Sequence, residues 1–94
     1  MPAIATIVSA VAEQMEVEEK SIYTSVRGPA NIPRWMALLL SREVGMHSLN
    51  EICQAFGMTH IPGVAQAVKS LERAADNDKK LSKSKAILIH HLTP

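Results

Sequence analysis

Apolar residues recur at spacings of three and four along most of this chain, which is the period of amphipathic α-helices. Ile22 is the inward-facing residue of the shortest such run, while Asn31 and Pro33 suit the cap and the first turn of a longer one. Gly28 and Pro29 prevent a helix from continuing between these two runs. Outside the central part of the chain, the pattern predicts helices over residues 4–15, 18–25, 33–46 and 78–92.

Residues 47–73 form the most informative stretch. Ser48 and Glu51 have the spacing of a capping box, in which a hydroxyl and a carboxylate each bind a free amide at the start of a helix. Gly57 stands where a left-handed residue ends a helix, and Pro62 suits the first turn of the next helix. Apolar positions at helical spacing mark the buried faces of these two helices: Leu49, Ile52, Cys53 and Phe56 in the first, and Val64, Ala67, Val68 and Leu71 in the second.

A capped short helix, a glycine turn and a longer helix predict a helix-turn-helix, a unit whose second helix usually enters the DNA major groove. The same pattern occurs in αα-hairpins of ordinary helical bundles, so the pattern alone does not establish DNA binding. From all these stretches we expect an all-α fold: a small bundle of about six helices in a single domain over residues 1–94.

Composition limits the class of protein. The chain has 94 residues, of which 47% are hydrophobic, enough for one small core and too many for disorder. The single cysteine, Cys53, lies on an apolar helix face and is expected to be a buried hydrophobe in a reducing cytosol. No apolar run approaches the ~20 residues of a membrane span. We therefore expect a cytoplasmic protein with no membrane partner.

The sequence contains no motif that supports catalysis or cofactor binding. It contains no GxxxxGK[ST] loop for nucleotide phosphates and no Ser/His/Asp or Cys/His grouping. His90 and His91 are adjacent, so on a helix they project about 100° apart, which suits a shared metal ion poorly. We expect neither enzyme activity nor a nucleotide, cofactor or metal site.

The net charge is only +1, but the charges are unevenly distributed. Acidic residues crowd the first fifth of the chain, and all cations except Lys20 lie at or beyond Arg27. A basic face for nucleic acid would exist if the fold gathers five of these cations on one side. The alternative is a solvated surface of mixed charge. The five cations are Arg27, Arg34, Arg42, Lys69 and Arg73.

Four segments carry a resemblance to a known family: VAEQMEV, IPRWMALLLSREV, HSLNEICQAFG and the A-x-A-V-K pattern that ends at Lys69. In this order and spacing they resemble the C-terminal DNA-binding domain, domain IV, of the bacterial chromosomal replication initiator DnaA. The resemblance covers residues 4–92. It implies sequence-specific binding of double-stranded DNA, in replication initiation or in the regulation of replication or transcription.

The resemblance also assigns DNA contacts to individual residues. It implies that Arg27, in a loop, enters the minor groove, and that Arg34 and Arg42 bind backbone phosphates. Trp35 replaces the family's usual glutamine, so one phosphate contact is lost or becomes packing. Ser48, at the start of the first helix of the pair, belongs to the same set of candidate contacts.

The family's base-reading signature is missing. Where the family has Asp-His-Thr-Thr-Val, this chain has His60-Ile61-Pro62-Gly63-Val64, and only the packing valine is retained. Each good base contact contributes roughly 1–3 kcal/mol of discrimination. Because Ile61, Pro62 and Gly63 offer no side-chain hydrogen bonds, we expect the family's usual DNA box not to be recognised.

Base reading would then shift to other residues. Thr59 and His60 are polar, and Gln66 can pair bidentately with adenine if it faces the groove. Lys69, one turn further, can hold phosphate or guanine. Ile61 and Pro62 can touch only apolar surface, such as a thymine methyl group. A different DNA site, nonspecific binding and the loss of DNA binding all stay open.

A second function, from another class, is a degenerate helix-turn-helix used for protein–protein contact. It is favoured by Met58, Ile61 and Pro62, apolar residues at an exposed turn that a partner would cover. A positive face across Arg27, Arg34 and Lys69 would favour DNA instead. The sequence leaves open the DNA target, the oligomeric state and whether the chain is a fragment of a larger protein.

Overall fold

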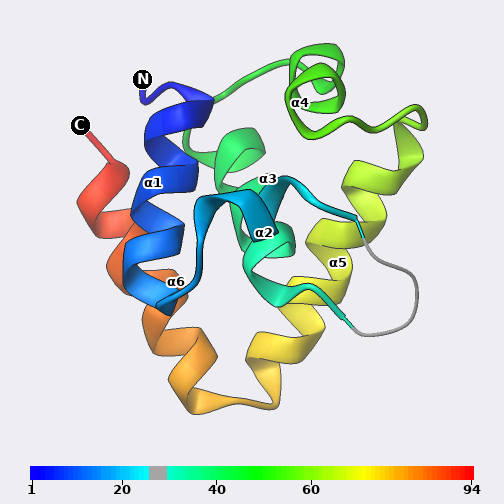
Figure 1. The fold of residues 1–94 in the computed structure, drawn as a ribbon. Coiled ribbons are helices and arrows are strands. Elements are labelled where there is room, and N and C mark those ends of the chain that lie inside the picture. Colours follow the sequence, from blue (N-terminus) through cyan, green and yellow to red (C-terminus); the bar gives the residue numbers. More distant parts are fainter. Residues whose placement is uncertain (26–29) are drawn as a thin grey trace.

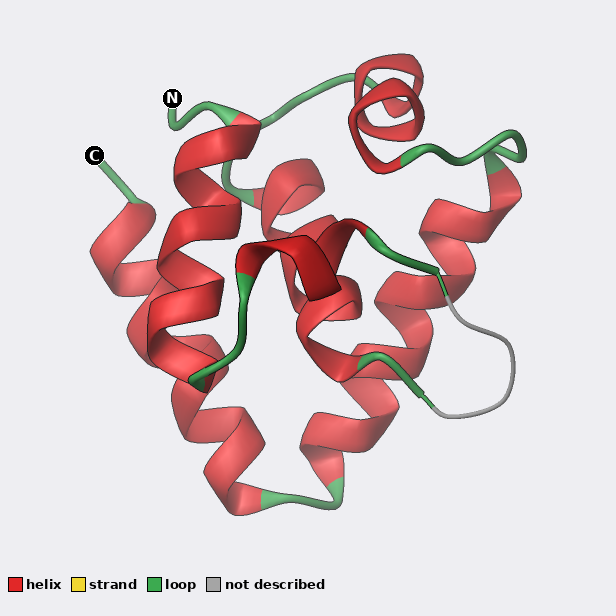
Figure 2. Ribbon diagram, in the orientation of Figure 1, coloured by secondary structure: helices red, strands yellow, loops and turns green. Residues whose placement is uncertain are grey.

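The computed structural model of this protein describes residues 1–25 and 30–94, and every regular element in these residues is a helix (Figures 1 and 2). The predicted all-α fold is therefore confirmed. Its six helices are α1 (Ile4–Met15), α2 (Glu19–Tyr23), α3 (Ile32–Glu43), α4 (Leu49–Phe56), α5 (Pro62–Asp76) and α6 (Lys79–Leu92).

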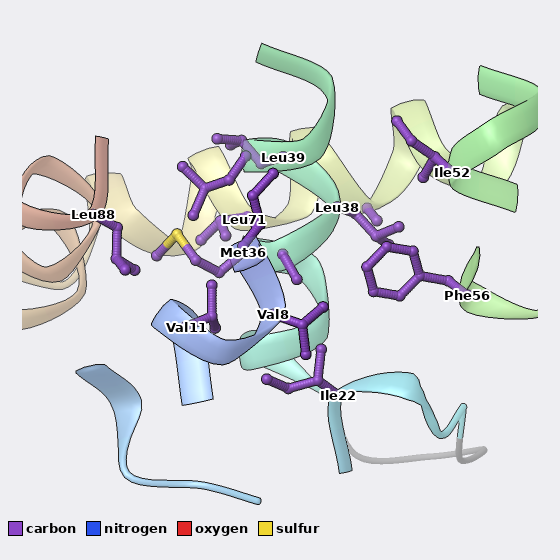
Figure 3. Close-up of a cluster of buried hydrophobic side chains, with 14 of the residues drawn as sticks. Val8, Val11, Ile22, Met36, Leu38, Leu39, Ile52, Phe56, Leu71 and Leu88 are labelled. Carbon is purple, nitrogen blue, oxygen red and sulfur yellow. The ribbon is translucent and has the colours of Figure 1, made fainter. Parts of the chain in front are cut away.

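Helix α3 is the centre of the bundle. It packs against α1, α2, α4 and α5, and its middle is buried on every side, so that even Ala37 and Ser41 are inaccessible. Figure 3 shows side chains of neighbouring helices packed around it, including Val8 of α1 and Leu71 of α5. Four neighbouring helices leave the middle of α3 little contact with water.

The other helices are arranged around α3 in two groups. Helices α1 and α6 lie side by side on the left of Figure 1, with both chain termini near their upper ends. Helices α4 and α5 lie on the right; α4 is seen nearly end-on, whereas α5 runs across the view. The axes of α4 and α5 are thus far from parallel.

The predicted helix ends are largely confirmed. The Asn31 side chain accepts from the Arg34 amide at 3.1 Å, and Ser48 and Glu51 form the expected capping box. Gly57 has a φ of 65° and ends α4 in the left-handed conformation. Helix α6 begins at Lys79 and is capped by Asp78, the first residue of the helix predicted over residues 78–92. No helix in the described part of the chain is long and apolar enough to cross a membrane.

Candidate nucleic-acid interface

Helix α5 has one face in the core and the opposite face in water. Its buried side is made of Val64, Ala67, Leu71 and Ala75, and it packs mainly against α3. Residues 57–61 connect α4 to α5, and the Met58 amide donates to the Cys53 carbonyl at 2.8 Å, which closes the end of α4. The outer face of α5 is therefore held in a fixed position by the core behind it.

Four exposed residues form a line along this outer face, which we call the α5 stripe. At 100° per residue they fall within roughly 60° of one another, directly opposite the buried side. The stripe begins with an apolar residue, continues with an amide and ends with two cations. Its members are Pro62, Gln66, Lys69 and Arg73.

The stripe contains one residue, Arg73, to which the sequence analysis assigns no DNA contact. Gln66 and Lys69 were predicted DNA contacts, whereas Arg73 was counted only among the cations. Its signal was available in the sequence, because Arg73 follows Lys69 by four residues and so shares its helix face. Glu72 and Asp76 are also exposed on α5 and both lie on the same side of the two cations, so the four charges of this helix sum to zero.

The start of α5 offers few polar groups. Pro62 has no amide hydrogen, the Gly63 amide donates to the His60 carbonyl at 2.9 Å, and the Val64 amide donates to the Ile61 carbonyl at 3.0 Å. Among the described residues, no side chain caps this helix. The amides that often bind an anion at a helix N-terminus are therefore used within the turn itself.

The apolar residues of this turn differ in exposure. Ile61 is 42% exposed and Pro62 is also exposed, whereas Met58 is half-buried and packs partly on the core. A Cβ atom added to Gly63 would lie only 2.9 Å from the Met58 Cε atom. The missing side chain of Gly63 thus leaves room for the methionine methyl group.

An open groove of about 630 Å³ separates the start of α3 from the turn and the first half of α5. Besides Arg34, four predicted contact residues line it: Thr59, His60, Gly63 and Gln66. Trp35 forms part of the α3 wall and is half-buried. The structure therefore gathers one cluster of candidate base readers around a single concave surface.

Arg34 requires a correction, because its guanidinium is turned into the protein. Only 6% of this residue is exposed. Its Nη1 donates to the carbonyls of Ile22 at 3.1 Å and Tyr23 at 2.8 Å, and its Nη2 donates to the Phe56 carbonyl at 2.8 Å. Arg34 thus ties the last residues of α2 to the last residue of α4, and we discard its predicted role at a DNA phosphate.

The surroundings of Arg34 explain how a buried cation is tolerated. The carbonyls at the C-terminal ends of helices carry partial negative charge, and Arg34 binds two such ends. Its Cζ atom lies 5.7 Å from the centre of the Phe56 ring, whose own neighbour is the Tyr23 ring at 5.4 Å. No carboxylate of residues 1–25 and 30–94 forms an ion pair with it. Burial accordingly lowers the pKa of the Arg34 guanidinium.

The remaining candidates do not join the groove. Arg42 is exposed in the last turn of α3, eight residues from Arg34, so it lies at the other end of the helix. The Ser48 hydroxyl accepts from the Glu51 amide at 3.1 Å, at the end of α4 distant from the turn. Arg27 lies outside the described residues. The DNA contacts implied for these three residues stay predictions.

Comparison with known proteins supports the resemblance. No protein-family model matches the sequence. The chain is similar to the C-terminal region of the chromosomal replication initiator protein DnaA of Methylobacillus flagellatus, with 32% identity over 87 residues. These residues make up 92% of this chain and 18% of that protein, so the chain spans less than a fifth of its relative's length.

Proposed function

We propose that this domain binds double-stranded DNA, with α4, residues 57–61 and α5 acting as a helix-turn-helix. The observation that carries the proposal is the α5 stripe, because it places an amide and two cations on the one face of α5 that the core leaves free. In most helix-turn-helix proteins the second helix lies in the major groove. Similarity to a DNA replication initiator over nearly the whole chain supports the same assignment.

Within this proposal the residues divide into two roles. His60, Ile61 and Gln66 face base edges, because they are exposed and lie at the turn or in the first half of α5. Lys69 and Arg73 bind phosphates, since they follow along the same line and carry the charge. With Arg34 withdrawn into the core, the phosphate contacts depend more on the second half of α5 than the resemblance implies.

The biological setting follows from the relative. A domain of this kind acts in replication or in transcriptional regulation, alone or as the DNA-binding part of a larger protein. The family's usual box is not its target, because the turn and the start of α5 present no side-chain donors or acceptors at positions 61–63.

Fluorescence anisotropy tests the proposal. The purified domain is titrated with two labelled duplexes, one carrying a DnaA-type box and one scrambled, at several salt concentrations. We expect similar binding to both duplexes with a steep salt dependence, because phosphate contacts dominate. Preference for the box would contradict our interpretation that residues 61–63 cannot recognise it. If neither duplex binds at low salt, DNA binding is refuted.

A pair of charge-matched variants locates the interface. Replacing Lys69 and Arg73 with glutamine should lower the slope of log K against log salt by about 0.9 for each lost phosphate contact. Replacing Lys79 and Lys83 on α6 removes the same charge from exposed residues of another helix. That control should retain the wild-type slope; equal loss in both variants would show that net charge, not the α5 stripe, causes binding.

Protein–protein contact is a second candidate function, favoured by the 42% exposure of Ile61 beside the exposed Pro62. A protein partner would bury these side chains without requiring polar readers. This function would replace the first if the domain fails to bind either duplex at low salt. A titration with DNA therefore separates the two functions before any partner is sought.

A further inference from the structure

We infer that Arg34 is a positioning residue for DNA binding. Without touching DNA, it fixes where residues 57–61, and with them the start of α5, lie relative to α2 and α3. The inference rests on the proposed DNA binding and goes beyond it, because it gives a role in that binding to a guanidinium that is bound inside the protein. It follows from the hydrogen bonds of the guanidinium and from those of the turn.

The turn between α4 and α5 has few ties of its own to the rest of the fold. The Met58 amide donates back into α4, to the Cys53 carbonyl at 2.8 Å. In the described part of the chain, one hydrogen bond joins residues 49–61 to α1, α2, α3 or α6. It runs from the Arg34 Nη2 atom to the Phe56 carbonyl at 2.8 Å. Apart from apolar packing, the position of the turn therefore depends on Arg34.

Phe56, the last residue of α4, is held by its carbonyl and by its ring. The Arg34 Cζ atom lies 5.7 Å from the centre of this ring, and the centre of the Tyr23 ring lies 5.4 Å from it. Only 2% of Phe56 is exposed. Because Gly57 follows directly and ends α4, a shift of Phe56 would be passed on to the turn.

The other end of the tie is also well fixed. Four consecutive carbonyls at the end of α2 accept hydrogen bonds from the start of α3. Asn31 Nδ2 donates to those of residues 21 and 24 at 2.9 and 3.1 Å, and Arg34 Nη1 donates to those of residues 22 and 23 at 3.1 and 2.8 Å. A guanidinium is planar and rigid, so its two terminal nitrogens keep a constant separation. Arg34 therefore sets the distance between the end of α2 and the end of α4.

This distance affects the open groove, because both ends lead into residues that line it. Ser25 follows α2, Thr59 and His60 follow α4, and all three line the groove together with Arg34. When the parts of a binding surface can move, only the fraction of molecules with the correct arrangement binds. By holding the turn in one place, Arg34 raises that fraction.

The salt dependence of binding separates positioning from phosphate contact. Arg34→Met removes the three hydrogen bonds of the guanidinium. We expect this variant to bind the scrambled duplex about tenfold more weakly than the wild-type domain, the loss that follows if the turn is correctly placed in a tenth of the molecules. The slope of log K against log salt should stay the same, because no phosphate contact is lost.

Two control variants exclude other causes, provided that circular dichroism shows every protein to be fully folded at the temperature used. Leu88→Ala removes a buried side chain of α6 that is 2% exposed and does not line the groove, so it should lower stability but retain the wild-type affinity. Lys79→Met removes one exposed charge from α6 and should change the affinity by less than about twofold.

A milder variant keeps the inference testable if Arg34→Met does not fold. Arg34→Lys retains the charge and a donor but lacks the planar fork, so it should lose part of the affinity, again with the wild-type slope. NMR relaxation of the free domain gives a readout without DNA. The amides of residues 57–61 should become more mobile in either Arg34 variant and not in Leu88→Ala.

The outcomes separate this inference from the proposed function. Wild-type affinity in a folded Arg34 variant, an equal loss of affinity in Leu88→Ala, or an unchanged mobility of residues 57–61 would overturn the inference and leave DNA binding intact. A slope lower by about 0.9 in Arg34→Met would also overturn it, because Arg34 would then contact a phosphate. Failure of the wild-type domain to bind any duplex at low salt would overturn both.

Discussion

The pair Ile-Pro occurs at the start of two helices of this domain, as the first two residues of α3 (positions 32–33) and as the N-cap and first residue of α5 (positions 61–62), and the two starts have opposite surroundings. At the start of α3, Asn31 caps the helix, and the cation that follows the proline is buried. At the start of α5, no side chain of the described residues provides a cap, and Ile61 is 42% exposed. The proline fits the first turn in both helices.

The difference shows that the position of a helix in the fold decides what its first turn does. Helix α3 has neighbours on four sides, so its start is enclosed by the ends of α2 and α4. Helix α5 is packed on one face only, so its start and its outer face are open to a partner. Arg34 at the start of α3 and the cations of α5 therefore have different surroundings, and this difference can be tested by mutation.

The largest expected effect is at the enclosed start. Arg34→Met removes three hydrogen bonds and leaves the carbonyls of Ile22, Tyr23 and Phe56 buried without this donor. We expect the free energy of unfolding to fall by about 3 kcal/mol, measured by urea denaturation followed by circular dichroism. Arg42→Met, at the exposed end of the same helix, should cost less than about 0.5 kcal/mol. Equal costs would refute the structural role of Arg34.

Most of the fold could be predicted from the sequence because its signals are local. A capping box, a left-handed glycine and an apolar period each depend on residues within one or two turns, so Ser48, Gly57 and Ile22 were placed correctly. The burial of the middle of α3 on every side was not predicted, since it depends on four other helices that pack around it.

The candidate site could be predicted only in part, for the same reason. Thr59, His60 and Gln66 line one groove because they are close in the chain and share the start of one helix. The inward turn of Arg34 depends on carbonyls 12, 11 and 22 residues away, and no local pattern reports such distances. An arginine after a helix-initiating proline looks the same in sequence whether it faces phosphate or the core.

A second prediction compares the residues that precede the two Ile-Pro pairs. Asn31 caps α3 and also donates from Nδ2 to the Ser21 and Thr24 carbonyls at 2.9 and 3.1 Å. Asn31→Ala should therefore cost about 2 kcal/mol, whereas His60→Ala, before the second pair and one residue ahead of the N-cap of α5, should cost less than about 0.5 kcal/mol. Both values can be read from urea unfolding curves. Similar costs would show that the two starts are equivalent after all.

A third prediction uses the two glycines on either side of the open turn. Gly57 has a positive φ, so Gly57→Ala should destabilise the domain by about 1 kcal/mol although no atom would touch the new Cβ. Gly63 lies inside α5, where alanine favours the helix but displaces the flexible end of Met58, so Gly63→Ala should change stability by less than about 0.5 kcal/mol. Thermal unfolding of the two variants checks the order.

The smallest effect concerns the start of α4, which is exposed like α5 but capped like α3. The pKa of the Glu51 carboxyl is lowered from its ordinary 4.5, first because the Ser48 amide donates to it, with further contributions from the Ser48 hydroxyl and the His47 ring. Because the pKa is lower in the folded protein, the unfolded chain binds the proton more tightly. The ionised carboxylate therefore stabilises the fold at pH values above the pKa of the unfolded chain, and this contribution is lost as the pH falls through the lowered pKa of the folded protein. Thermal midpoints measured between about pH 5.5 and pH 3 should therefore fall more steeply for the wild-type domain than for Glu51→Gln. Parallel curves for the two proteins would mean that the carboxylate of the capping box, unlike the contacts of Arg34 and Asn31, does not help to hold its helix start.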